Sequence, residues 1–204
     1  MNKRLVLEVG CLLLAGILVL GLTGCLWLRP VFFPDRALES AVRASLSKPF
    51  GFLTEADLLQ ITELQATGLN IRDLRGLEYC TSLTTLNLRS NKIQSLAPLA
   101  GLANLTWLHL GDNIITDIQP LSGLLFLEYL NLFGDANEIY SWTPLVANAQ
   151  AGGIGNGTVA ILPTRTTLTS DETIQEYFQP TYLTLIDAGV QVIFAAPDGS
   201  EVSF

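Results

Sequence analysis

Three aromatic residues and one arginine recur at matching intervals in the middle of the chain and could form a binding surface. Trp107 and Tyr129 are 22 residues apart, and Arg89 and Phe133 are separated by two such intervals. Exposed rings beside an arginine are the usual composition of a binding hot spot. The predicted partner-binding residues are Trp107, Tyr129, Phe133, Arg89 and the neighbouring His109. The alternative, which the sequence leaves open, is that these rings pack on one another or on the C-terminal part of the chain.

Catalytic and metal chemistry has few candidate residues. His109 is the only histidine and there are three cysteines, too few soft ligands for a Cys/His zinc site. No serine, cysteine or second histidine is arranged with His109 as a catalytic triad would require. The glycines of 152–157 precede an expected strand rather than a helix, so they do not match a dinucleotide-binding fingerprint and indicate a flexible linker. We predict no catalytic residue, no cofactor and no metal site.

The interval of 22 residues belongs to an internal repeat. Copies that start at Leu83, Leu105 and Leu127 share the pattern L-x-x-L-x-L, then Asn, then Ile, then Pro-Leu, and an imperfect copy starts at Ile61. The alternating leucines predict a short strand with one buried face. One copy cannot bury its leucines alone, so successive strands must stack in parallel.

This pattern resembles the leucine-rich repeat of bacterial internalins. The resemblance implies an α/β solenoid of about four coils over 61–148, with a parallel β-sheet on its concave face. It also implies a helical N-terminal cap over 35–60 and an α/β C-terminal cap and tail over 149–204. Strand residues between the leucines would point outward on the concave face, where repeat solenoids usually bind. The predicted partner-binding residues would lie there.

Polar and small residues within the repeat have expected structural roles. Asparagines that follow the strands should satisfy backbone groups that would otherwise be buried without partners. They are Asn91, Asn113 and, after a two-residue insertion, Asn137. Cys80 takes the place of a leucine in the next two copies, so we expect it to be a buried apolar residue.

The flanking segments contain helix and strand signals. Asp35 is a predicted N-cap for an amphipathic helix, and Thr54 with Asp57 resembles a capping box. Downstream we expect a strand over 158–162, a mostly helical segment over 170–188 and a strand over 190–195.

The N-terminus is typical of a targeting segment. Lys3 and Arg4 precede an apolar run, as in a secretory signal peptide over 1–24. The ending Leu22-Thr23-Gly24-Cys25 resembles the lipobox of bacterial lipoproteins, which implies cleavage before Cys25 and acylation of that residue. Residues 25–34 would then be a tether. The alternative is an uncleaved signal anchor, because 9–28 has no charge and is long enough to span a bilayer.

Charge and resemblance together suggest a function class. The net charge of −8, from 11 basic and 19 acidic residues, argues against nucleic-acid binding. We predict a non-enzymatic, membrane-anchored leucine-rich repeat protein that binds a protein or glycan through its concave sheet. The resemblance to a lipobox implies a location outside the cytoplasm, at a bacterial outer membrane or cell surface. The alternative is a structural cell-envelope lipoprotein without a discrete ligand.

Overall fold

The computed structural model describes residues 29–134, 136–155, 159–163, 185–195 and 201–202. The predicted signal segment and the predicted lipidation site Cys25 lie outside these residues, as does most of the predicted helical segment over 170–188. Within the described part of the chain, no helix has both the length and the apolar character needed to cross a bilayer.

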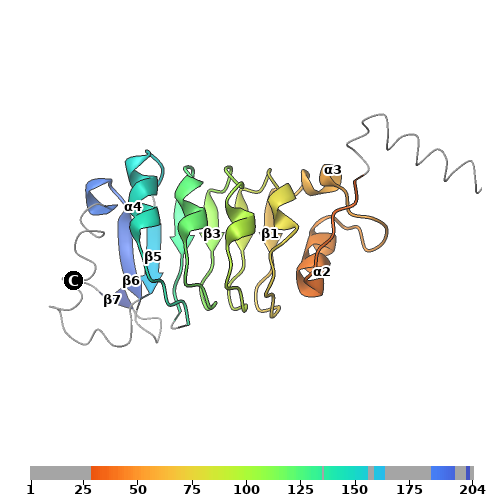
Figure 1. The fold of residues 1–204 in the computed structure, drawn as a ribbon, viewed down its shortest axis with the longest axis horizontal. Helices are drawn as coiled ribbons and strands as arrows, with labels where there is room; N and C mark the ends of the chain where they lie inside the picture. Colours follow the sequence, from red (N-terminus) through yellow and green to blue (C-terminus); the bar gives the residue numbers. More distant parts are fainter. Residues whose placement is uncertain (1–28, 135, 156–158, 164–184, 196–200, 203–204) are drawn as a thin grey trace, which may run out of the picture.

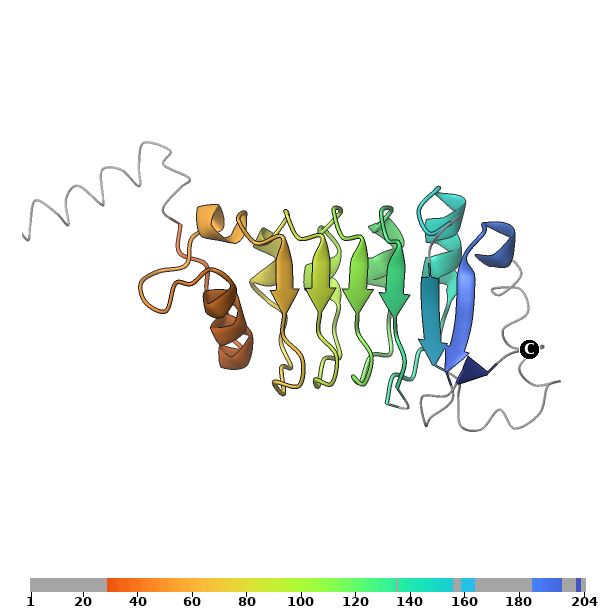
Figure 2. The same ribbon diagram turned by 180° about the vertical axis from the view of Figure 1, so that it is seen from behind.

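Seven strands of the described residues form one sheet in the order of the sequence (Figures 1 and 2). They are β1 Glu63–Gln65, β2 Thr85–Asn87, β3 Trp107–His109, β4 Tyr129–Asn131, β5 Val159–Pro163, β6 Gln191–Ala195 and β7 Glu201–Val202. Strands β1 to β6 are parallel, and β7 pairs with β6 in the antiparallel direction. The predicted parallel stacking is confirmed, and β7 is a strand that the sequence pattern did not indicate.

Short helices form the side of the molecule opposite the sheet (Figure 1). They are the 3₁₀-helices η2 Leu77–Tyr79, η3 Ala97–Leu99 and η4 Gln119–Gly123, followed by the α-helix α4 Thr143–Gln150. The second residue of η3, η4 and α4 is a proline: Pro98, Pro120 and Pro144. A proline in the first turn of a helix removes no helical hydrogen bond, so these residues can direct the chain back toward the next strand without loss of backbone hydrogen bonds.

A continuous apolar core lies between the sheet and these helices. The repeat leucines fill it, and Leu86, Leu108 and Leu130 of the central strands are completely buried. Cys80 is also completely buried, and burial raises the pKa of its thiol to about 12. The prediction that Cys80 is an apolar core residue is confirmed.

The predicted asparagines join neighbouring coils through buried amides. Asn113 is the clearest case, because its Nδ2 donates to the carbonyls of Leu88, Leu110 and Gly111 at 3.0, 2.9 and 3.2 Å. Its Oδ1 accepts from the N–H of Ile93 at 3.0 Å. Asn91 and Asn137 bond in the same way to the coils before them. These bonds satisfy backbone groups that turn into the core, as predicted.

A fourth buried amide fixes the turn after α4. Nδ2 of Asn148 donates to the carbonyls of Leu121, Ser122 and Leu124, each at 3.1 Å. Oδ1 of Asn148 accepts from the N–H of Ile154 at 2.6 Å. A side chain at Gly153 would collide with this same Oδ1. The expectation of a flexible linker is therefore wrong for 152–155, because this glycine turn is held by a buried hydrogen-bond centre.

Two helices cover the N-terminal end of the sheet, α2 Arg36–Ser45 and α3 Glu55–Leu58. Asp35 is the N-cap of α2, and its second carboxylate oxygen accepts from the backbone N–H of Arg72 at 2.8 Å. Thr54 and Asp57 form the predicted capping box at the start of α3. The Asp35 bond joins α2 to the first coil, so this carboxylate has a tertiary role beyond capping.

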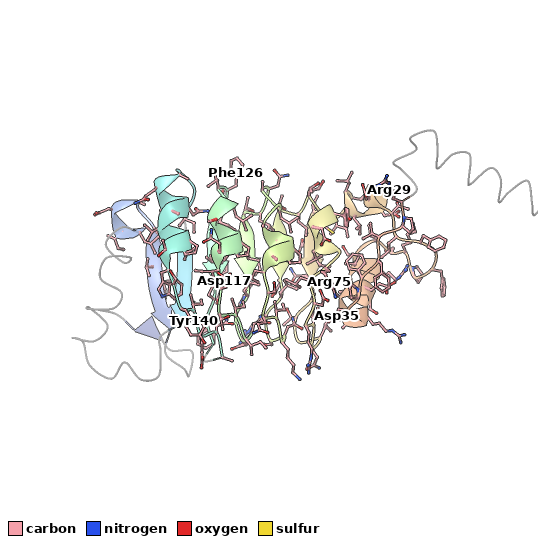
Figure 3. All side chains as sticks on the ribbon, in the orientation of Figure 1. Arg29, Asp35, Arg75, Asp117, Phe126 and Tyr140 are labelled. Carbon is pink, nitrogen blue, oxygen red and sulfur yellow. The ribbon has the colours of Figure 1, made fainter. Side chains whose placement is uncertain are left out.

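Part of the segment expected as a tether belongs to the folded domain. The N–H of Val31 donates to the carbonyl of Leu53 at 2.7 Å. Phe33 is 2% exposed, and its ring lies where a side chain at Gly76 would otherwise be. Val31 is therefore held by the N-terminal cap and Phe33 by the first coil, with Arg29 and Asp35 on either side at the same end of the molecule (Figure 3).

Candidate partner-binding site

Residues on either side of the buried strand leucines are partly exposed in β2 and β3. They lie on the face of the sheet opposite the leucine core, which we call the open face; this side of the sheet faces the viewer in Figure 2. Trp107 of β3 lies directly beside Tyr129 of β4 in the parallel register. Their rings stack with centroids 4.9 Å apart and planes 6° apart. Both side chains are partly exposed. The register of a 22-residue repeat thus brings together two rings that are far apart in the sequence.

His109 joins this pair from the same strand as Trp107. The centroid of its imidazole lies 5.8 Å from that of Trp107 and 6.4 Å from that of Tyr129, with tilted planes. Nδ1 of His109 accepts a hydrogen bond from the N–H of Gly111 at 3.1 Å. An accepting Nδ1 requires the neutral tautomer with its proton on Nε2. The ring can therefore offer one N–H donor to a partner.

Charges near His109 favour its neutral form. Burial lowers the pKa of His109 below 6.5, the positive charge of Arg89 lowers it further, and the carboxylate of Asp112 opposes both effects. Nε of Arg89 lies 3.1 Å from Oδ2 of Asp112, and the hydroxyl of Ser90 donates to the same oxygen at 3.2 Å. The side chains of Arg89 and Asp112 are 50% and 35% exposed. An ion pair this exposed adds little stability, so both groups remain available to a polar partner.

Phe133 lies apart from the ring cluster. Among the described residues, no ring contact joins it to Trp107, His109 or Tyr129, in contrast to the predicted aromatic cluster. The contacts of Phe133 with the site are made by its backbone. Its N–H donates to Oδ1 of Asn131 at 2.9 Å, and its carbonyl accepts from the N–H of Asp112 at 2.6 Å. Strand β4 ends at Asn131, and the repeat carries its insertion directly after Phe133.

Asn131 is a residue of the site that the sequence reasoning did not single out. It is 7% exposed, and its Nδ2 donates to the hydroxyl oxygen of Tyr129 at 3.1 Å. With its Oδ1 held by the backbone of Phe133, the amide fixes the tyrosine hydroxyl in place. The sequence does place Asn131 two residues after Tyr129 on the same expected strand. A polar residue at such a position is usually exposed to water, so its type alone did not indicate a role in the site.

We expect His109 to titrate with a midpoint below 6.5, measured from its single imidazole resonance in proton NMR. Arg89→Gln should raise this midpoint because it removes a repelling charge, whereas Asp112→Asn should lower it further. The native state favours the neutral ring, so the unfolded chain binds the proton first as pH falls. The stability due to His109 is therefore present above pH 6.5 and is lost as pH falls through the native pKa. A midpoint at or above 6.5 in the wild-type protein would contradict the burial of this ring.

Metal ligands are not gathered in the described residues, where no group of three or more His, Cys, Asp or Glu side chains could hold an ion. The polar groups of the open face, His109, Arg89 and Asp112, surround the aromatic pair as hydrogen-bond donors and acceptors. This composition suits recognition of a surface.

Comparison with known proteins gives partial matches to internalins. No family model matches the chain. Internalin H of Listeria monocytogenes is 38% identical over 65 residues, which are 31% of this chain and 12% of Internalin H. The crystal structure of an internalin, InlF, from Listeria monocytogenes aligns with a TM-score of 0.54 at 25% identity, over 82% of this chain and 58% of that one. The chain is therefore similar to internalins in its leucine-rich repeat fold, and it spans less than two thirds of either relative.

Proposed function

We propose that this chain is a non-enzymatic, membrane-anchored leucine-rich repeat protein that binds a protein or glycan partner through the open face of its sheet. The observation that carries the proposal is the stacked pair of Trp107 and Tyr129, with His109 and the Arg89–Asp112 ion pair beside it. Similarity to internalins supports an extracytoplasmic binding role.

The aromatic pair has little structural reason to be where it is. The core beneath it is already filled by leucines such as Leu108 and Leu130, which are completely buried. The two rings do stack on each other, as the packing alternative expects, yet both remain partly exposed. A stacked pair that keeps accessible surface is a rigid aromatic anchor for a partner, because little side-chain entropy remains to be lost on binding.

The proposal includes the organisation inferred from the sequence. About four coils over 61–148 would display the binding face, with a helical cap over 35–60 and an α/β cap and tail over 149–204. A signal peptide over 1–24 and lipidation at Cys25 would hold the protein at an outer membrane or cell surface, unless the segment stays uncleaved as an anchor. Phe133 would contribute at the margin of the site, since it lies apart from the three rings.

The experiment is a crosslinking pull-down from native membranes that compares wild type with Trp107→Ala/Tyr129→Ala. We expect capture of the partner to fall about 30-fold or more, because central aromatic anchors each contribute about 2 kcal/mol or more. The matched control is Phe126→Ala/Tyr140→Ala, which removes two aromatic side chains that are 65% and 63% exposed and lie outside the strands (Figure 3).

The two outcomes separate the candidate functions. Loss of a captured protein or glycan in the Trp107/Tyr129 variant alone supports a binding module. Equal capture by all three proteins would contradict it and favour the structural envelope role, in which the domain packs into the envelope without a discrete ligand. Circular dichroism of each variant confirms that the comparison is between folded proteins.

A further inference from the structure

Three phenylalanines project into solvent at the N-terminal end of the solenoid. Phe32, Phe50 and Phe52 are 79%, 85% and 79% exposed, and we call them the phenylalanine patch. Single exposed apolar residues are common on protein surfaces, but a group of large ones marks an interaction site. None of the three contributes to the buried core or to the open face of the sheet.

Backbone contacts bring two segments of the patch side by side. Pro30 forms an isolated antiparallel bridge with Thr54, and the N–H of Val31 donates to the carbonyl of Leu53. Phe32 and Phe52 are the next residues along these two segments. Alternation along an extended chain then turns one set of side chains inward and the other outward.

The burial of the neighbours agrees with this alternation. Phe33 and Leu53, which flank Phe32 and Phe52 in sequence, are each 2% exposed. The outward direction of Phe32 and Phe52 therefore follows from the core packing of the residues beside them.

The position of the patch along the chain points to lipid as its partner. The described chain begins at Arg29, and the preceding residues 9–28 are apolar and uncharged. Phe32 lies four positions after the end of this apolar stretch and seven positions after Cys25. An extended chain covers about 3.5 Å per residue, so the patch lies within roughly 25 Å of the predicted acylation site. The patch must stay near the bilayer whenever the N-terminus is in it.

The net charge differs between the N-terminal end of the molecule, which carries the patch, and the rest of the chain. Residues 29–60, which contain α2 and α3, hold four basic and four acidic side chains, a balance of 0. Residues 61–204 hold five basic and fourteen acidic side chains, a balance of −9. An anionic lipid surface repels the second part and not the first. The N-terminal end, which carries the phenylalanine patch, is therefore the end that such a surface repels least.

We propose that the phenylalanine patch inserts into the interfacial region of an anionic lipid bilayer and sets the orientation of the domain. This inference rests on the N-terminal anchor proposed above. The segments that carry the patch flank α2 and α3, which lie at one end of the long axis of the solenoid (Figure 1). Insertion would therefore keep the strands away from the lipid and leave the open face accessible to a partner.

The test uses the full chain in vesicles of equal parts phosphatidylcholine and phosphatidylglycerol, made with and without bromine on the acyl chains. Phe52→Trp introduces a fluorescent reporter into the patch, and the matched control Phe126→Trp places one at another exposed phenylalanine, in the repeat array. The emission of wild type is subtracted from both. Interfacial side chains lie about 5–10 Å into the headgroup and acyl boundary, so brominated lipid should quench roughly half of the emission added by Phe52→Trp. The emission added by Phe126→Trp should be unchanged.

Flotation of the same samples separates the two proposals. Protein that floats with the vesicles and is quenched only through Phe52→Trp supports the patch as a lipid contact. Protein that floats but shows equal, unquenched emission from both reporters overturns the patch and leaves the anchor intact. Protein that does not float overturns both.

Discussion

Asn113→Ala should lower the free energy of unfolding by about 3–5 kcal/mol, because it removes four hydrogen bonds from a fully enclosed amide. The N–H of Ile93 would lose its acceptor. The carbonyls of Leu88, Leu110 and Gly111 would each lose one of two donors, because Asn91, Asn137 and Ser90 also donate to them. Asn113 is 1% exposed, so water cannot replace the amide without opening the coil. Urea unfolding followed by far-UV circular dichroism measures the change as a lower midpoint with an unchanged slope.

Asn104→Ala is the matched control for this prediction. Asn104 is also an asparagine that bonds to the coil before it, through Nδ2 to the carbonyl of Thr81 at 2.8 Å, but this bond is exposed. Water can take its place, so we expect a loss of about 0.5 kcal/mol or less. Equal losses at Asn113 and Asn104 would mean that burial of the amide does not determine its contribution.

Phe33→Ala should cost about 3–5 kcal/mol, the usual range for removal of a buried phenylalanine. The ring of Phe33 fills the space against Gly76, where only a residue without a side chain leaves room. Its loss creates a cavity between the N-terminal segment and the first coil. Thermal unfolding by calorimetry gives the change, and earlier proteolysis near Val31 would show that the segment has come loose.

Phe32→Ala supplies the comparison at the adjacent position. The same side chain is removed, but Phe32 is 79% exposed, so the stability should change by about 0.5 kcal/mol or less. A large loss from Phe32→Ala would show that the phenylalanine patch is part of the fold, and it would count against a role in lipid contact.

Much of the fold follows from the repeat because its spacing sets the strand register. Every copy places its leucines inward and its asparagine after the strand, so Asn91, Asn113 and Asn137 were identifiable from the sequence. Asn148 was not, because it lies only 11 residues after Asn137 and belongs to helix α4. Its Nδ2 donates to carbonyls of η4 and of Leu124 after it, and its Oδ1 accepts from the N–H of Ile154. The 22-residue spacing does not predict these partners.

The candidate site was predictable to the same extent. Trp107 and Tyr129 share a repeat position, so the register makes them neighbours. Phe133 shares a repeat position with Arg89, and its carbonyl accepts from Asp112 just as the carbonyl of Gly111 accepts from Ser90. Its side chain lies beyond the end of β4 and makes no ring contact with the three stacked or tilted rings. Repeat spacing thus predicts the backbone bonds between coils, but it does not predict side-chain contacts beyond the strand ends.

The asparagine bonds have an evolutionary consequence. Each amide reaches back to one preceding coil, as Asn91 does to Ala66 and Asn137 does to Leu110. A duplicated 22-residue unit inserted between β2 and β4 would therefore bring its own amide and its own carbonyls, and it would leave α2 and the antiparallel strand β7 at the two ends untouched. Gene duplication could widen the sheet by one strand at a time, and descendants of such a chain would differ in the breadth of the surface they display rather than in how they fold.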